Sequence, residues 1–505
     1  MYVLNSLPNP YRTTTLLPPF SCMEKEDEHL QEQRDSNNFA EGSITSSIAA
    51  LPNEILQDIF FWTIGRIHGG IYDKATIQNP LAFNDAHPNV TRRRIAGVCR
   101  LWKLILDGTP SLWTTVILDK PWKNTLATLT NILSSSAVST LELYISYTAF
   151  KSAIDASITI GTLRPHFSRI SLLVANFSAQ RTNTDMVILF GMFPWGIPAD
   201  KFERLRGLVF GVDGIRWDLP VEKMARIHIP TLSKLTLATP ASLIFHLLSS
   251  ASLEGLKEIR ISSPMDNNSL GILRNCRNLV DLDITLDLVP VDGDALSTTP
   301  AMFEHLVNFR ISVFSVNLSR LIAFFKWTKL PNLRQLSLHY LDGRTTFVET
   351  FCKCTALLAS IDAPTIVYLT LSRMLLQVED ASDMFTRFPN LSRLEFLRCK
   401  LAPVFFRNLE SWGDKHEKDM KTPEEIGLIS LSLCVFDIRD LKVFVEKQAA
   451  RGVGIFHFVM LARSLSPEDS SLLDWMVEFY PGVIELKRVK GWINNQSINN
   501  ILFRE

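Results

Sequence analysis

The chain has few cysteines, no long apolar run and no net charge. It holds seven cysteines in 505 residues and no CxxC pair, so we expect neither a disulfide framework nor a cysteine-based zinc site. No apolar stretch reaches the roughly 18 to 20 residues that a membrane span needs. The 52 basic and 52 acidic residues cancel, which argues against whole-molecule attraction to nucleic acid or anionic lipid. We therefore expect a soluble cytoplasmic or nuclear protein that binds neither membrane nor nucleic acid.

The motifs of common catalytic and cofactor sites are also missing. The sequence has no glycine-rich phosphate loop ending in lysine and no dinucleotide-binding glycine motif. Its ten histidines are not placed at metal-ligand spacing, and it has no serine nucleophile elbow. The close pair Cys352 and Cys354 falls in a segment of helical periodicity, where a buried structural role is favoured. These absences predict a protein that is not an enzyme and uses no metal or cofactor.

Residues 1–45 have the composition of a disordered tail. A proline-rich start is followed by a polar stretch, and the first 50 residues carry three basic and seven acidic side chains. So little apolar surface cannot offset the entropy of ordering the segment. A short solvated helix over 23–34 is the alternative. The prolines interrupt the apolar start, so we expect no secretory signal.

Residues 46–118 carry two amphipathic helical patterns. The first has Pro52 in its opening turn, where a missing N–H costs nothing. Its apolar face consists of Leu51, Ile55, Leu56, Ile59 and Phe60. Residues 65–90 show no period and are expected to form an inserted loop. The second pattern ends near Gly108, and its apolar face consists of Ile95, Val98, Cys99, Trp102 and Ile105.

A repeat extends over most of the remaining chain. Its unit is an apolar residue, two variable residues, an apolar residue, one variable residue and another apolar residue. Its copies begin at Leu205, Leu232, Leu256, Leu279, Leu306, Leu333, Ile366, Leu391 and Leu428, with a weaker one at Phe167. The steps run from 23 residues (Leu256 to Leu279) to 37 (Leu391 to Leu428), and several copies follow a Pro-Asn or Pro-Thr pair. This spacing is typical of leucine-rich repeats with intervening loops.

Segments of helical periodicity separate these predicted strands. They cover residues 318–329, 346–360, 381–388, 439–451 and 468–480. Strand alternating with helix at a regular period predicts an α/β fold in which each unit buries its apolar side by stacking on the next. The sequence therefore predicts a small helical domain at 46–118 and a leucine-rich-repeat solenoid, a horseshoe, over 119–505.

The two helical patterns together resemble the F-box. The resemblance rests on LPNEIL at 51–56, VCRLW at 98–102 and SLW at 111–113. Residues 65–90 separate its two halves by more than the usual spacing. An F-box before irregular leucine-rich repeats is similar to the F-box domain-containing proteins of basidiomycete fungi.

The resemblance implies a substrate receptor of an SCF-type cullin–RING ubiquitin ligase. The F-box would bind the Skp-type adaptor, and the repeats would hold a protein substrate. Exposed apolar helix faces are recurring docking surfaces, which agrees with this role. The expected adaptor-binding residues are Leu51, Pro52, Ile55, Leu56 and Ile59, with Val98, Trp102 and Trp113 fixing the module behind or beside them. A core role is the alternative, above all for Trp102.

A substrate is expected on the concave face of the repeats. The residues between the apolar positions of each strand point to that face, because side chains alternate along a strand. The candidates are Arg260, Asp283, Arg310, His339, Tyr368, Arg393 and Glu395. Both signs of charge occur there, which suits a protein ligand better than a phosphate backbone. A purely solvated strand face, a repeat scaffold not engaged in ubiquitination, and a hydrolase with an unrecognised site are the alternatives.

Overall fold

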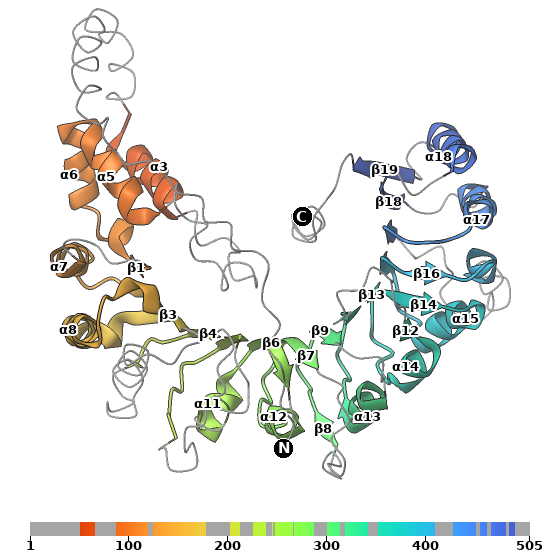
Figure 1. Cartoon of the computed structure of the whole chain (residues 1–505), viewed down its shortest axis with the longest axis horizontal. Coiled ribbons are helices and arrows are strands. Elements are labelled where there is room, and N and C mark those ends of the chain that lie inside the picture. The colour runs from red at the N-terminus through yellow and green to blue at the C-terminus, as the bar shows by residue number, and fades with distance from the viewer. Residues whose placement is uncertain are drawn as a thin grey trace, which may run out of the picture.

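The computed structural model describes a helical N-terminal part followed by a long curved sheet (Figure 1). The described residues are 51–65, 87–119, 125–177, 202–212, 226–238, 245, 248–265, 267–286, 300–313, 319–341, 352–409, 428–450, 455–461, 466–480 and 484–489. The predicted tail at 1–45 and most of the predicted insertion lie outside them. No helix in this described part is long and apolar enough to span a membrane.

Among the described residues, three α-helices and a 3-10 turn form the N-terminal part, which we call the helical unit. They are α3 (Asn53–Gly65), α5 (Pro88–Val98), α6 (Arg100–Asp107) and η3 (Pro110–Trp113). His87 caps α5, and Pro88 opens it as the missing N–H allows. The last residues of the predicted insertion at 65–90 are therefore helical, which corrects that boundary.

The second predicted helix is in fact two helices. Cys99 has an extended backbone, with φ −161° and ψ 168°, and separates α5 from α6. The apolar residues on either side of this break no longer share one face. Ile95 and Ile105 are buried, whereas Val98 and Cys99 are exposed. The prediction of a common face was wrong because it extended one helical period through an extended residue.

In the part of the chain that the structure describes, fourteen strands form one sheet in which each strand lies parallel to the next, in chain order. They are β1 (Thr115–Leu118), β2 (Leu141–Ser146), β3 (Ile170–Phe177), β4 (Gly207–Val212), β5 (Lys234–Ala238), β6 (Glu258–Met265), β7 (Asp281–Leu286), β9 (Asn308–Val313), β11 (Gln335–Tyr340), β13 (Tyr368–Ser372), β15 (Arg393–Leu397), β17 (Leu428–Ser432), β18 (Ile455–Leu461) and β19 (Ile484–Val489). The sheet begins at Thr115, a few residues before the predicted domain boundary at 118/119. The predicted α/β class with repeating strands is confirmed as a large parallel sheet with helices.

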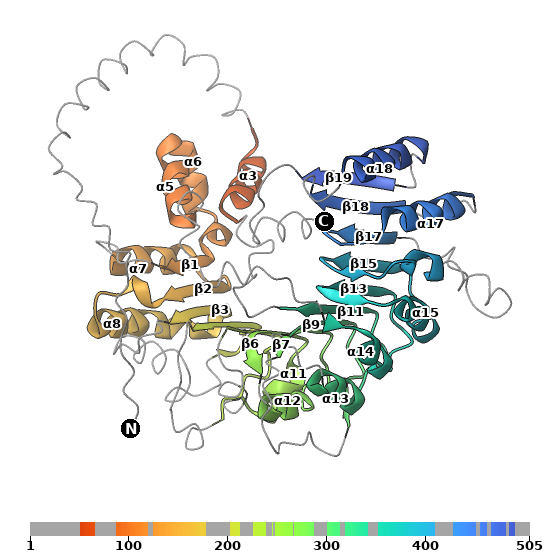
Figure 2. The same ribbon diagram turned by 45° about the vertical axis from the view of Figure 1, so that its right-hand side comes forward.

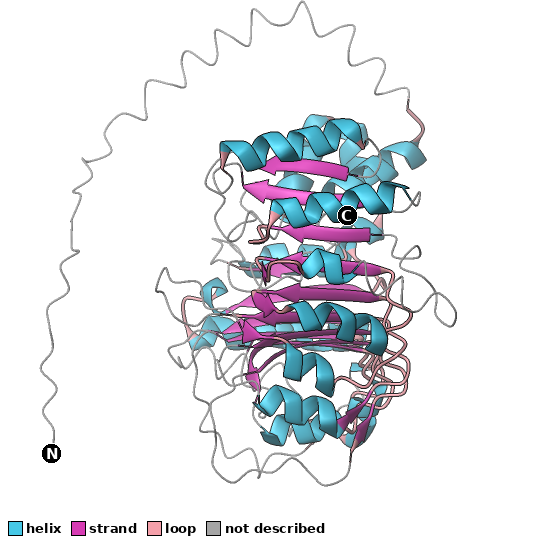
Figure 3. Ribbon diagram, turned by 90° about the vertical axis from the view of Figure 1, so that its right-hand side faces the viewer, coloured by secondary structure: helices cyan, strands magenta, loops and turns pink. Residues whose placement is uncertain are grey.

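The helices lie on the outer side of the curved sheet (Figure 1), and the strands stack one above another when the molecule is turned (Figures 2 and 3). They are α7 (Thr125–Ser135), α8 (Ala153–Leu163), α11 (Ser250–Gly255), α12 (Asn267–Leu273), α13 (Ser319–Trp327), α14 (Thr355–Ser360), α15 (Val378–Arg387), α17 (Ile438–Ala450) and α18 (Pro467–Phe479). In the chain, the short η4 (Tyr147–Ala149) follows β2 and η5 (Arg164–Arg169) follows α8. Two small sheets pair β8 (Ala301–Met302) with β10 (Thr328–Lys329), and β12 (Cys352–Lys353), β14 (Met374–Leu376) and β16 (Lys400–Leu401) with one another. The face of the large sheet opposite these helices is called the inner face below.

Backbone hydrogen bonds explain why the apolar repeat produces this arrangement. The first apolar residue of a copy closes a turn, as where Leu391 N donates to Phe388 O at 3.0 Å. The next repeat then attaches through a shared carbonyl, since Lys257 O accepts both Val280 N at 2.8 Å and Asp281 N at 3.0 Å. Turn and ladder together leave the apolar side chains facing the helices and bury them between layers.

The Asn or Thr before the first apolar residue links neighbouring repeats. Asn332 Nδ2 donates to Glu304 O at 2.7 Å, and Asn390 Nδ2 donates to Pro364 O at 3.0 Å. Thr365 Oγ1 donates to the equivalent carbonyl, Pro331 O, at 3.2 Å. The Pro-Asn and Pro-Thr pairs of the sequence are therefore hydrogen-bonding positions between repeats.

Two predicted repeat copies are shifted. In β17 the buried apolar residues are Ile429 and Leu431, which pair with Leu394 and Phe396, so the copy placed at Leu428 is out of frame. In β3 a register irregularity makes Leu173 the buried residue in place of Leu172. Long apolar alternation fits the repeat in more than one frame, and a bulge changes which side a residue faces.

The predicted helix at 346–360 also needs correction. Only Thr355–Ser360 is helical, Cys352–Lys353 is a short strand, and residues 346–351 lie outside the described part. Cys354 is buried next to the sulfur of Met374, at 3.5 Å. The other four predicted helices overlap α13, α15, α17 and α18.

A single continuous apolar cluster runs from Leu56 in the helical unit to Met476 in α18.

Candidate functional site

An apolar stripe on α3 faces solvent, and we call it the α3 stripe. It comprises Pro52, Ile55, Ile59 and Trp62. Ile55 is 46%, Ile59 43% and Trp62 67% exposed. Spacings of four and three residues place these side chains on one side of the helix. Glu54 and Asp58 are exposed beside them, so the stripe has an acidic margin.

The opposite side of α3 holds the helix to the rest of the chain. Leu56 is 0% exposed and joins Phe60 and Ile64 in the apolar cluster. Leu56 therefore cannot belong to an adaptor-binding surface, which corrects the sequence-based assignment. Leu51 is half-buried and packs against the same cluster. Helical geometry explains the split, because consecutive residues such as Ile55 and Leu56 lie about 100° apart.

The two predicted tryptophans fix the helical unit internally. Trp102 is half-buried, with its ring centroid 5.0 Å from that of Phe60 in an edge-on contact between α6 and α3. Trp113 is buried, and its Nε1 donates to Leu106 O at 2.8 Å. Both side chains therefore lie behind the α3 stripe and are not part of it.

A second exposed apolar group lies around the break between α5 and α6. It comprises Val98, Leu101 and Leu104, and we call it the α6 stripe. Its neighbours Arg94, Arg100 and Lys103 are exposed, so its margin is basic. Sequence reasoning missed Trp62, Leu101 and Leu104. The spacing of Trp62 from Ile55 and Ile59 would have placed it on the same side of the helix. Leu101 and Leu104 could not be found in this way, because nothing in the sequence marks the break at Cys99.

On the inner face, strand register brings Arg260, Asp283 and Arg310 side by side. Glu258 lies between two cations, 2.8 Å from Lys234 and 2.9 Å from Arg260. Arg310 lies 3.8 Å from Asp283. Acid and base alternate across neighbouring strands, so the charges of this first group largely compensate one another.

A second group combines Tyr368, Arg393 and Glu395 on β13 and β15. The guanidinium of Arg393 lies 4.8 Å from the centre of the Tyr368 ring. The Tyr368 hydroxyl donates to the Glu395 carboxylate, which also accepts from Thr370 Oγ1 at 3.1 Å. Burial and this carboxylate raise the pKa of Tyr368, so its hydroxyl stays protonated. The structure thus brings three predicted residues into one preorganised cluster.

His339 lies on β11 between these two groups. Burial and the positive charge of Arg310 lower the pKa of His339 to about 3. Its imidazole is therefore neutral near pH 7 and adds no charge to the inner face. Between the two charged groups the neighbouring inner positions, such as Ser337 and Thr370, are short hydroxyl side chains.

Within the described residues, no group of three or more histidine, cysteine or acidic side chains is placed to hold a metal ion. The two apolar stripes and the inner face are the candidate surfaces that the described residues present.

Comparison with known proteins does not identify the chain: no protein-family model matches it, and no curated protein matches it.

Proposed function

We propose that this chain is an F-box protein with leucine-rich repeats, acting as a non-catalytic substrate receptor of an SCF-type ubiquitin ligase. The helical unit would bind the Skp-type adaptor, and the inner face would bind a protein substrate. Ubiquitin transfer would be carried out elsewhere in the complex, so that this chain contributes proximity.

The observation that carries the proposal is the exposed α3 stripe. A helix that buries one side and leaves two isoleucines and a tryptophan in water has apolar surface available for a partner. Aromatic side chains are enriched among the residues that dominate interface energy, and Trp62 is the most exposed of the large apolar side chains on α3. The sequence resemblance to the F-box implies that this partner is a Skp-type adaptor.

The inner face supports the substrate-binding half of the proposal. Its tyrosine, arginines and carboxylates are held by contacts with one another, so a substrate would meet ordered polar groups. Such a surface favours selectivity over raw affinity, because a wrong partner must break existing ion pairs.

Co-purification with a Skp-type adaptor tests the proposal. Ile55→Asp/Ile59→Asp places two charges on the α3 stripe, and we expect the adaptor to be lost from the purified complex. The matched control is Ile154→Asp/Ile158→Asp on α8, where two exposed isoleucines have the same spacing. If wild-type chain retains no adaptor, the rival function, a repeat scaffold outside ubiquitination, replaces the proposal. If the Ile55/Ile59 variant retains it, the interface lies elsewhere.

A further inference from the structure

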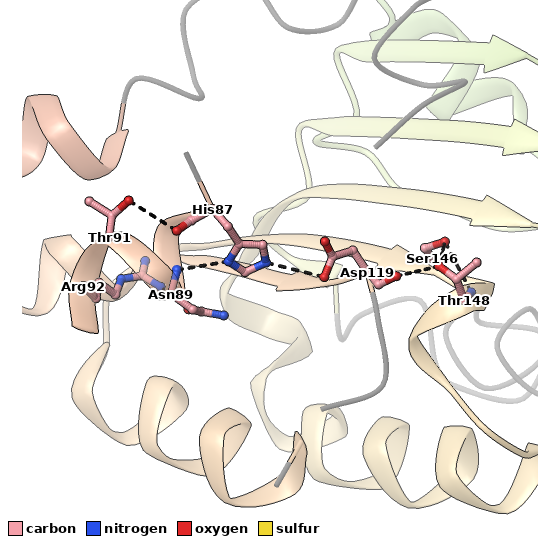
Figure 4. A network of polar contacts seen from close by, with 7 residues as sticks. All are labelled: His87, Asn89, Thr91, Arg92, Asp119, Ser146 and Thr148. Atoms are coloured by element: carbon pink, nitrogen blue, oxygen red, sulfur yellow. Dashed lines mark hydrogen bonds and ion pairs between the residues drawn. The ribbon is translucent and has the colours of Figure 1, made fainter. Parts of the chain in front are cut away.

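A buried polar network joins the helical unit to the sheet (Figure 4). Its centre is Arg92 on α5, which is 2% exposed. Arg92 Nε donates to Leu112 O at 2.8 Å, and Nη2 donates to Thr115 O at 3.1 Å. One guanidinium thus holds the carbonyl groups of η3 and of the first sheet strand at once.

Two further contacts fix the direction of this guanidinium. Its Nη1 donates to Asn89 Oδ1 at 2.8 Å, one helical turn earlier on α5. Its carbon lies 5.2 Å from the centre of the Trp113 ring. Burial lowers the pKa of Arg92 to about 10, which leaves the group charged near pH 7. A planar fork with several fixed donors suits this bridging, whereas lysine offers one point charge.

A second tie starts at His87, the cap of α5. Its Nδ1 accepts from Asn89 N at 3.2 Å, so the ring proton lies on Nε2, which is 3.5 Å from Asp119 Oδ1. Asp119 follows β1, and its backbone oxygen accepts from Thr148 Oγ1, after β2, at 2.6 Å. The start of α5 is therefore linked in turn to the ends of β1 and β2.

We propose that Arg92 is a positioning residue that fixes the orientation of the helical unit on the sheet, with the His87–Asp119 pair as a second tie. Domains linked through small polar contacts usually move relative to one another. Here the contacts are buried, directional and continuous with the apolar cluster, so the two parts move as one body. If the proposed function holds, a substrate on the inner face would keep a constant distance from the adaptor.

We call this fixed orientation of the helical unit on the sheet the lock. Distance measurement by pulsed electron spin resonance tests it, and the measurement needs no partner. Spin labels on an encoded keto amino acid are placed at Asp58 on α3 and Glu254 on α11, both exposed. A second pair, at Ser157 on α8 and Ala323 on α13, lies on two helices that cover the sheet and gives the width expected of a rigid body. We expect the two wild-type distributions to be equally narrow. A clearly broader or two-peaked Asp58–Glu254 distribution would overturn the lock whatever the variants show.

Variants then assign the lock to Arg92. Arg92→Leu should broaden the Asp58–Glu254 distribution to at least about twice the wild-type width, as expected of domains whose interface is loosened. Arg94→Leu, which changes an exposed arginine on the same helix, should leave it unchanged. If Arg92→Leu loses helical circular dichroism, Arg92→Lys is measured in its place, and we expect the same broadening. A narrow distribution in the folded Arg92 variant refutes the assignment and leaves adaptor binding untouched.

Discussion

Truncating the α3 stripe provides the sharpest test of how the helical unit functions. Ile55→Ala/Ile59→Ala/Trp62→Ala removes most of its exposed apolar surface without opening the core, because the buried side of α3 is unchanged. Surface substitutions usually change the free energy of unfolding by no more than about 0.5 kcal/mol each, so we expect the three together to change it by no more than about 1.5 kcal/mol.

The expected loss of binding follows from the exposed fractions. Full burial of an isoleucine side chain contributes about 1.5 to 3 kcal/mol, so the exposed half of each gives roughly 1 kcal/mol. A tryptophan buries about 150 to 250 Å², and two thirds of that area at ~25 cal/mol per Å² gives roughly 2.5 to 4 kcal/mol. These terms sum to about 4.5 to 6 kcal/mol, and ordering the side chains at the interface offsets about 0.5 to 1.5 kcal/mol, so we expect a loss of about 3 to 5.5 kcal/mol, or a Kd at least about 100-fold weaker.

Isothermal titration calorimetry of purified chain with a Skp-type adaptor measures this change. The matched control is Ile154→Ala/Ile158→Ala on α8, where the two isoleucines are 71% and 49% exposed and also four residues apart. The control should bind as the wild type does. Equal affinity of the triple variant and the wild type would refute the docking role of the α3 stripe. Equal weakening by the control would show a non-specific apolar effect.

Three further predictions concern stability. Leu56→Ala should lower the free energy of unfolding by about 2 to 5 kcal/mol in urea titration, since Leu56 is fully buried, whereas a small effect would contradict its core position. Asn332→Ala removes a hydrogen bond between repeats and should cost about 1 kcal/mol in the same assay; no change would refute this linking role. Unfolded histidine titrates near 6.5, so the unfolded chain takes up a proton that folded His339, with its pKa lowered to about 3, does not. The free energy of unfolding should therefore fall as pH drops from about 6.5 towards 3. Urea denaturation at pH 7 and pH 5 measures this fall, and His339→Gln should make it smaller. The same pH dependence in the variant and the wild type would contradict the prediction.

The strands were predictable because their signal is repeated. One copy of the apolar pattern, such as that around Leu333, could belong to many folds. Many copies at similar steps predict that the units stack, because stacking buries the apolar side chains of every copy. Frame errors arose where alternation is longer than the unit, as from Leu428 to Leu433. There the pattern alone cannot say which residues face the helices, and only pairing with β15 decides it.

The candidate surfaces were harder to predict because exposure depends on the partner helices. Ile55 and Leu56 are both apolar and adjacent in sequence, yet one is in water and the other in the core. The break at Cys99 carries no glycine or proline signal, and it turns Val98 outward. The role of Arg92 could not be predicted either, because three consecutive arginines favour a solvated helix face. Arg92 differs from its two neighbours by its hydrogen bonds to the buried carbonyl groups of Leu112 and Thr115, which the sequence does not show.

The two candidate surfaces differ in how they could gain energy from a partner. The α3 stripe has unburied apolar area, so a partner gains hydrophobic energy there without breaking contacts within the chain. The charges of the inner face are already engaged, as Glu258 is with Lys234 and Arg260. A substrate must replace those contacts with equivalent ones, so its net gain is small unless its charges match in position. If the proposed function holds, we therefore expect a tight, permanent partner at the helical unit and a selective, exchangeable one on the inner face.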